Sequence, residues 1–363
     1  MFIRHYNNDY IEEYEIIDDN TKMGRFKKKG DICYIGKLVN GLREGKGVLY
    51  NKNNKIIYEG EFHENQYEGK WKLYDNIGGY YVGDFIGSFL FGEGKKFDKN
   101  NNLLYEGQFV YGIEEGEGKE IFENGEYYIG EFKGGKCQGK GKVFNKNNKI
   151  LYEGQLKDDK AEGFGMIYFE NNTYYKGEFI NGNKSGKGKI FDEKNRLIYE
   201  GESKNNKAEG KGKWYYDDGS YYIGEFSKGY IAGKGKKFDK NNILIYEGDY
   251  NLGKYHGKGT LYLKDGKYIG DFVDGQRHGK GKFFDANDRF IYEGDWKYDK
   301  MEGNGDIFFK NGYKYLGQIS NGKMNGDGIL FDKDQNIEYE GKFDNIDFIK
   351  RNFLKELKKM KNY

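Results

Sequence analysis

Aromatic and glycine residues recur along the chain in one short pattern. A Tyr-x-Gly triplet appears fourteen times at steps of 22 to 24 residues, and a mostly aromatic residue stands two positions after each glycine. Because strand side chains alternate between two faces, the tyrosine, the glycine and this aromatic residue share one face of a strand. The tyrosines are Tyr34, Tyr58, Tyr81, Tyr105, Tyr128, Tyr152, Tyr175, Tyr199, Tyr222, Tyr246, Tyr268, Tyr292, Tyr315 and Tyr339.

A Gly-x-Gly triplet follows seven residues after the aromatic position and predicts a second strand with a bare face for the rings. Turn signals such as Asn40-Gly41 and Asn181-Gly182 lie between the two strands, so each repeat is predicted to be a β-hairpin. We therefore expect an all-β fold, an elongated single-layer antiparallel meander of about 14 hairpins over residues 34–343. The structural positions singled out are Tyr34, Gly36, Tyr58, Gly60, Phe62, Tyr81, Gly83, Phe85, Tyr128, Gly130, Phe132, Gly139 and Gly141.

The repeats alternate in length, which groups them into seven pairs of about 47 residues. In long repeats the residue between Tyr and Gly is always Glu, as at Glu153 and Glu200. In short repeats it is mostly apolar, which predicts apolar stripes on the face opposite the rings. Those stripes either pack against the sheet itself or form a surface for a partner or a second copy. The candidate stripe residues are Ile35, Val82, Ile129, Ile223, Ile269 and Leu316.

Charged residues on that opposite face predict a ladder of pairs. The residue after the Tyr-x-Gly glycine is expected to face the middle residue of Gly-x-Gly in the same hairpin, as Glu131 would face Lys140. Seven of the eight hairpins with Lys in the middle position have an acid as this partner. Each such pair is worth ~0.2–1 kcal/mol. We interpret this charge as a solvated salt-bridge ladder rather than a ligand site.

Both ends of the array depart from the repeat. Residues 1–33 are predicted to form an N-terminal cap with a degenerate half-repeat, since Gly24 stands where a second Gly-x-Gly glycine would. Residues 344–363 predict a short amphipathic α-helix, because Ile346, Ile349, Phe353 and Leu357 recur at helical spacing. This helix either covers the last sheet edge or binds an anionic membrane or a partner. Its basic candidates are Lys350, Arg351, Lys355, Lys358, Lys359 and Lys361.

Composition narrows the class of protein. The mean hydropathy of −0.99 is typical of disorder, but 18% aromatic residues and 57 glycines favour a fold built on rings and bare backbone. The formal net charge of +2 argues against a nucleic-acid partner. With two distant cysteines, no apolar run of a signal peptide and no long apolar stretch, we expect a cytoplasmic protein.

The sequence favours no catalytic or cofactor site. Its Gly-x-Gly triplets do not lie between a strand and a helix, and no Gly-Lys is followed by Ser or Thr, so nucleotide-binding motifs are absent. The four histidines have no cysteine or carboxylate constellation that would complete a metal site. We therefore predict no enzyme activity, no cofactor and no metal.

The unit YIGEFKGGKCQGKGKVF (128–144) resembles the MORN repeat, named for membrane occupation and recognition nexus. The resemblance covers about residues 34–343, with alternating spacings of 23 and 24 where the family is uniform. It implies an elongated hairpin array. Members with lipid kinase or lysine methyltransferase domains carry them beside the repeats, and this chain has only about 33 residues before the array and 20 after it.

Repeat-only members of that family resemble scaffolds of cytoskeletal, cell-division and axonemal structures. The resemblance therefore implies a non-catalytic scaffold, associated with the cytoskeleton at a cilium, axoneme or cell cortex. Its expected partners are cytoskeletal or axonemal proteins, with a homodimer as a further possibility. The alternative is a peripheral membrane tether that binds anionic phospholipids or phosphoinositides.

Overall fold

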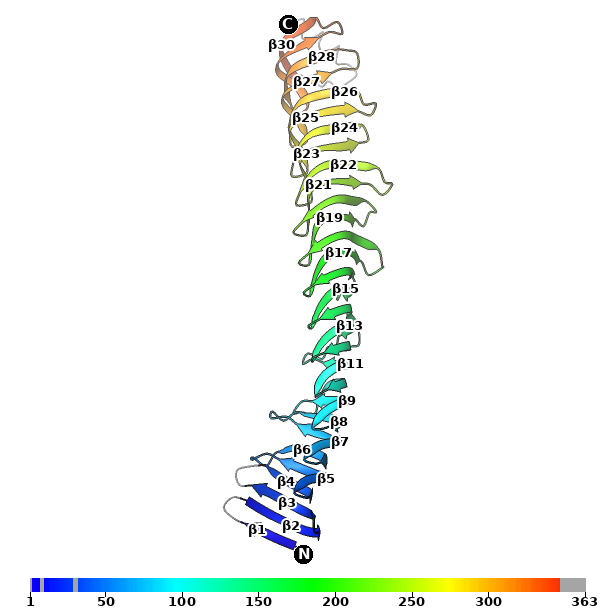
Figure 1. Cartoon of the computed structure of the whole chain (residues 1–363). Coiled ribbons are helices and arrows are strands. Elements are labelled where there is room, and N and C mark those ends of the chain that lie inside the picture. Colours follow the sequence, from blue (N-terminus) through cyan, green and yellow to red (C-terminus); the bar gives the residue numbers. More distant parts are fainter. Residues whose placement is uncertain (1, 7–9, 29–31, 347–363) are drawn as a thin grey trace. The chain divides into compact units, whose positions relative to one another are not determined.

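The computed structural model describes residues 2–6, 10–28 and 32–346. The chain divides into two compact units, residues 1–183 and 184–363, and each is an open antiparallel meander whose strands pair with their neighbours in chain order (Figure 1). All assigned elements in the described ranges are strands, so the all-β hairpin prediction is confirmed. Within those ranges, no helix is long and apolar enough to cross a membrane.

The described residues of the first unit form sixteen strands. They are β1 (Phe2–Tyr6), β2 (Tyr10–Asp18), β3 (Thr21–Lys28), β4 (Cys33–Val39), β5 (Leu42–Tyr50), β6 (Ile56–His63), β7 (Gln66–Tyr74), β8 (Tyr80–Ile86), β9 (Phe89–Phe97), β10 (Leu103–Val110), β11 (Ile113–Ile121), β12 (Tyr127–Lys133), β13 (Lys136–Phe144), β14 (Ile150–Lys157), β15 (Lys160–Tyr168) and β16 (Tyr174–Ile180).

The second unit contains the remaining strands of the described residues. They are β17 (Asn183–Phe191), β18 (Leu197–Lys204), β19 (Lys207–Tyr215), β20 (Tyr221–Ser227), β21 (Tyr230–Phe238), β22 (Leu244–Asn251), β23 (Lys254–Leu263), β24 (Gly266–Val273), β25 (Gln276–Asp285), β26 (Phe290–Lys297), β27 (Lys300–Phe308), β28 (Lys314–Ser320), β29 (Lys323–Phe331) and β30 (Ile337–Ile346).

One face of each sheet, here called the ring face, is formed by the repeat tyrosines and the aromatic residues that follow them. The Tyr128 ring lies over Gly130 of its own strand and over Gly141 of the paired strand, where any Cβ would collide with it. Its hydroxyl donates a hydrogen bond to the Glu131 carbonyl at 3.0 Å. Burial raises the pKa of Tyr58 to about 12, so this kind of hydroxyl remains a donor at neutral pH. The glycines are therefore required by the rings.

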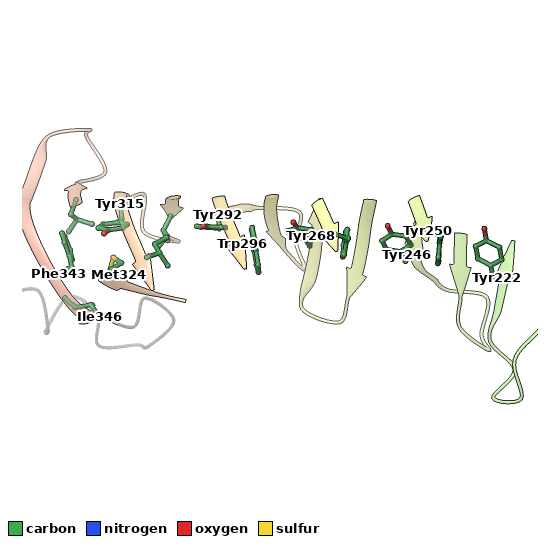
Figure 2. Close-up of a cluster of buried hydrophobic side chains, with 14 of the residues drawn as sticks. Tyr222, Tyr246, Tyr250, Tyr268, Tyr292, Trp296, Tyr315, Met324, Phe343 and Ile346 are labelled. Carbon is green, nitrogen blue, oxygen red and sulfur yellow. The ribbon is translucent and has the colours of Figure 1, made fainter. Parts of the chain in front are cut away.

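The rings of successive repeats interlock. In the second unit Tyr222 meets Tyr250 edge-on at 4.9 Å between ring centroids, and Tyr268 meets Trp296 at 4.9 Å. Figure 2 shows these side chains in a row that ends at Phe343 and Ile346. Edge-to-face pairs contribute about 0.5–1.5 kcal/mol beyond the buried area. Stability therefore accumulates from contacts between neighbouring repeats.

The alternation of 23 and 24 residues has a structural cause. In long repeats the strand pairing shifts just before the tyrosine: Phe144 pairs with Ile150, whereas Val143 pairs with Tyr152. Leu151 is thus the extra residue of a β-bulge. In the short repeat that begins at Tyr128 the pairing has no such shift: Tyr127, Tyr128 and Ile129 pair in order with Phe144, Val143 and Lys142. The predicted grouping of long and short hairpins reflects this bulge.

Tight turns of the predicted kind close the hairpins. Asn40 and Gly41 both have positive φ, at 50° and 80°, as do Asn181 and Gly182, at 49° and 79°. Positive φ at both central residues defines the type I′ turn, whose twist matches that of the strands. The turn signals between strands were therefore interpreted correctly.

The predicted pairing of the charged ladder was wrong by one repeat. Lys140 pairs with Gln155 of the next repeat, and Glu131 lies opposite a bulge in its own hairpin. The cause is a bulge at the first glycine of Gly-x-Gly. Gly139 has a φ of 62°, and residues 138–140 lie opposite the single residue Glu131. Glu131 instead accepts a hydrogen bond from the Lys140 backbone N–H at 3.1 Å.

Asp249, Asp271 and Asp295 each bond to both neighbouring strands. One oxygen of Asp271 accepts the Lys280 backbone N–H at 3.1 Å, and the other lies 2.6 Å from Nζ of Lys258. Gln318 makes the first of these bonds, to the N–H of Asp327, without a charge. This explains why glutamine replaces the acid in some repeats.

Gly24, which marks the predicted N-terminal half-repeat, lies in β3. Gly24 in β3 pairs with Gly36, as the second glycine of a Gly-x-Gly triplet does with the next repeat. On the other side it pairs with Tyr14, which stands where a glycine would be and stacks on Phe26 at 5.8 Å. The half-repeat is thus extended by β2 and β1.

At the C-terminal end, one residue of the predicted helix belongs to the sheet. Ile346 ends β30, pairs with Met324 and is buried. Pairing with the buried Met324 extends β30 beyond Phe343. The helical spacing of the apolar residues did not reveal this pairing. The other helix candidates, Lys350, Arg351, Lys355, Lys358, Lys359 and Lys361, lie outside the described residues.

Candidate docking grooves opposite the rings

The face opposite the rings, here called the ladder face, has a floor of bare backbone. Glycines of successive strands pair directly with one another: Gly118 with Gly130, Gly130 with Gly141, and Gly141 with Gly154. Side chains rise on both sides of this glycine row, from the residue before each glycine and from the residue after it. The result is a shallow depression that runs across the strands.

In the first unit the depression widens around Ile129 into a groove of about 550 Å³. Phe164, which is 53% exposed, contributes a ring to its wall. Lys142 pairs with Glu153 at 3.1 Å along one side. The groove thus combines a flat floor, two exposed apolar side chains and a charged rim.

A second groove in the same unit, of about 390 Å³, surrounds Ile35. Trp71 replaces the usual second glycine here and lines the groove, with Nζ of Lys46 5.6 Å from its ring centroid. Met23 and Val48 add apolar surface. This groove is lined by more apolar side chains than the other two.

The second unit repeats the arrangement around Ile269, in a groove of about 530 Å³. Its wall includes Lys258 and Lys280, whose ammonium groups lie 2.6 Å from the carboxylates of Asp271 and Asp295. Lys282 pairs with Glu293 at 3.1 Å on the other side. Charged side chains therefore surround a single apolar side chain, Ile269.

The candidate stripe residues occupy equivalent positions in their repeats, but they do not form a continuous apolar stripe. Ile35, Ile129, Ile223 and Ile269 are 40% to 44% exposed, whereas Val82 and Leu316 are half-buried. Polar side chains lie between them along the row, as Lys142 and Glu153 do after Ile129. Sequence reasoning identified these side chains but not the grooves that surround three of them.

Outside the grooves, the side chains that could take part in chemistry do not form a reactive site in the described residues. Cys33 and Cys137 are free and buried, and burial raises the pKa of Cys137, whose Sγ lies 3.8 Å from Glu120. A thiol kept protonated is a poor nucleophile. The described ranges contain no cluster of three His, Cys, Asp or Glu residues that could hold a metal.

Comparison with known proteins identifies the repeat. The MORN repeat family matches the chain at residues 34–55, 58–70, 105–127, 128–147, 152–174, 175–192, 199–221, 222–242, 246–267, 268–288, 292–312 and 315–336. No curated protein matches the chain.

Among solved structures, the chain is similar to a protein of unknown function from Bacteroides caccae, with 11% identity, 71% of this chain and 94% of that chain covered, and a TM-score of 0.15. It is also similar to BamB from Moraxella catarrhalis, with 12% identity, coverage of 87% and 90%, and a TM-score of 0.15. Scores this low carry no argument about function.

The twelve matched segments follow the hairpins seen in the structure, and their tyrosines and glycines form the ring face. MORN repeats are typical of repeat scaffolds for protein or membrane interaction. This chain belongs to the MORN repeat family.

Proposed function

We propose that the chain is a non-catalytic structural scaffold that docks protein partners on the grooves of its ladder face. The observation that carries the proposal is recurrence: grooves of similar make-up surround Ile35, Ile129 and Ile269. By the resemblance of repeat-only family members, the assembly is cytoskeletal, cell-division or axonemal, and the protein is cytoplasmic.

The chemistry of the grooves suits protein side chains. The floor of the groove is bare backbone, because the Cβ positions of its residues point to the ring face, and the exposed isoleucine offers one apolar contact. Ladder pairs such as Lys258 with Asp271 hold the rim charges in place and present them to polar groups of the partner. Each groove is small, so a single contact is weak, and tight binding requires several grooves to act together.

Charged substitutions at two groove centres test this proposal. We expect Ile129→Lys with Ile269→Lys to remove a set of neighbours from proximity labelling of the full-length protein in its own cell. The matched control is Ile180→Lys with Ile243→Lys, since these isoleucines are 52% and 62% exposed and do not line the three grooves. Identical labelling by both variants and by the wild type would contradict groove docking.

The alternative is a membrane tether, favoured by the charge of the C-terminal segment. Lys350, Arg351, Lys355, Lys358, Lys359 and Lys361 would face anionic phospholipids or phosphoinositides. The chain should be truncated after Ile346, because this residue is buried against β29. Loss of co-sedimentation with anionic liposomes in the truncated chain would support the tether. Unchanged co-sedimentation, or none in the full chain, would reject it.

A further inference from the structure

The hairpin tips of β8–β9 and β10–β11 carry a cluster of exposed apolar side chains. This apolar tip cluster consists of Ile86, Phe89, Val110, Tyr111 and Ile113, whose exposed fractions range from 41% to 64%. The tip residues 86–89 and 110–113 include no charged side chain. Exposed apolar surface gathered at one place is a common mark of an interaction site.

Five tips in the described residues are capped by a polar bond instead. A carboxylate of the preceding repeat accepts the backbone N–H of the tip, as Glu44 does from Glu64 at 3.1 Å and Glu115 from Gly134 at 2.9 Å. The residue equivalent to these glutamates before the β10–β11 tip is Phe91. It packs edge-on against Tyr111 at 4.7 Å between ring centroids. A polar cap has therefore been replaced by an aromatic pair.

The cluster extends beyond that pair and departs from the family pattern. Phe89 of the neighbouring tip also packs against Tyr111, at 5.6 Å. The ranges matched by the family leave out residues 71–104, which include the whole β8–β9 tip. Closing these hairpins does not require two adjacent apolar tips, because other tips close with Asn-Gly or Gly-Gly.

The tips on either side carry opposite charges. The preceding tip, residues 63–66, presents Glu64, and His63 there is bonded to Glu44 at 3.2 Å. The following tip, residues 133–136, presents Lys133 and Lys136, and Nζ of Lys136 lies 3.7 Å from Asp158. Along this edge the order is therefore acidic, apolar, apolar, basic. Successive tips are two strands apart, so the four tips span about 30 Å.

We propose that a second copy of this chain covers the apolar tip cluster through a two-fold contact. In such a contact the same surface patch meets itself, and the order of features is reversed in the partner. With the axis between the two apolar tips, the β8–β9 tip of each copy meets the β10–β11 tip of the other. Glu64 of each copy then faces Lys133 and Lys136 of the other. The charge order fits this occupant better than an anionic membrane, which would repel the acidic tip.

The first test measures dimerisation of the full-length chain by sedimentation velocity over a range of concentrations. The cluster variant is Phe89→Lys with Tyr111→Asn. Other tips carry Lys and Asn at the equivalent positions Lys136 and Asn181, and Asn tolerates the positive φ of 53° at Tyr111. We expect the dimer dissociation constant to rise on the order of 100-fold, as for hot-spot residues.

The matched control changes exposed aromatic residues at the equivalent tip positions of the second unit to the same two residue types. It is Tyr230→Lys with Tyr298→Asn, whose tyrosines are 57% and 60% exposed. We expect this variant to dimerise like the wild type. A wild type that is still monomeric at about 100 μM, where even weak micromolar complexes form, would overturn the proposal. Equal weakening of the dimer in both variants would also overturn it.

Charge reversal tests the two-fold arrangement itself and does not depend on the folding of the cluster variant. Glu64→Lys alone, and Lys133→Glu with Lys136→Glu, should each weaken the dimer by roughly 10-fold. All three changes in one chain should restore it to within a few-fold of the wild type. Failure of this rescue would overturn the two-fold contact. Binding of anionic liposomes by a monomer, lost in the cluster variant, would assign the cluster to a membrane instead.

Discussion

Strands β9–β13 of the first unit and β23–β29 of the second follow the same repeat, but their ring faces differ. In the second unit Leu261, Phe283 and Ile307 lie between the tyrosines. In the first, the equivalent positions hold Lys96 and Glu120. The repeat tyrosines and glycines therefore specify the backbone, while the positions between them can be apolar or charged.

The two regions also differ in how their charges are held. Lys96 pairs with Glu114 at 3.0 Å on the ring face, with side chains 35% and 16% exposed. In the second unit, ion pairs such as Lys280 with Asp295 lie on the ladder face, where Lys280 is 71% exposed. Partly buried ion pairs cost desolvation that exposed ones avoid. We infer that β23–β29 is the more stable of the two regions, and that β9–β13 gives up stability for polar contacts.

The largest expected effect breaks the ring row of the second unit. Trp296 is buried at 3% exposure, touches Tyr268 and Tyr292, and donates its indole N–H to the Gly281 carbonyl. We expect Trp296→Ala to lower the free energy of local opening by about 3–5 kcal/mol. Native-state hydrogen exchange should show the loss in β24–β27.

The comparison predicts that this loss stays local, because stability in repeat arrays comes from neighbouring contacts. Exchange in β9–β11 should be unchanged. Phe164→Ala serves as the control, since this ring is 53% exposed on the ladder face, and it should change stability by only about 0.5 kcal/mol. Uniform loss of protection along the whole chain would contradict the inference.

A smaller effect is expected from removing the carboxylate of Glu120 from the ring face of the first unit. Glu120 pairs with Tyr105 and Tyr128 on the ring face, and burial raises the pKa of its carboxyl. Val143 holds the equivalent position in the next repeat. We expect Glu120→Val to stabilise β10–β13 by about 0.5–2 kcal/mol at pH 7, measured by hydrogen exchange.

The sign of the pH dependence follows from the raised pKa. The folded state binds the Glu120 proton more tightly than the unfolded state does. The wild type is therefore favoured below the unfolded pKa of the carboxyl and loses this contribution as the pH rises through the folded pKa. The advantage of Glu120→Val should thus shrink towards pH 4. An advantage that grows on acidification would show that the carboxylate is stabilised rather than penalised.

The extent to which sequence predicts this molecule depends on whether a feature is local. The hairpins, type I′ turns and buried ring face follow from residue types at short fixed spacing, as at Tyr128, Gly130 and Phe132. The ladder register did not follow, because the positive φ of Gly139 shifts the pairing by an amount that composition does not reveal. The grooves depend on that register and could not be placed beforehand.

The apolar tip cluster was missed for a different reason. The turn signals in the sequence indicate only that each tip closes a hairpin. Comparing tips would have shown Phe91 at the position of capping glutamates such as Glu44 and Glu115, and Tyr111 at a turn position that is often Asn or Asp. A departure within an otherwise regular repeat is informative because its structural role is already known from the other copies.

The smallest expected effect separates the two bonds of a ladder acid in the second unit. Asp271→Ala removes both the acceptor for the Lys280 backbone N–H and the partner of the Lys258 ammonium group, and should cost about 1–2 kcal/mol. Asp271→Asn keeps a side-chain oxygen for the N–H, as Gln318 does in its hairpin, and should cost only about 0.2–1 kcal/mol. Hydrogen exchange of β24 and β25 at low and high salt separates the contribution of the ion pair from that of the hydrogen bond, since salt screens the ion pair but not the neutral hydrogen bond. Equal costs for the two variants would mean that the ion pair, and not the capped bulge, explains why this position is almost always Glu, Asp or Gln.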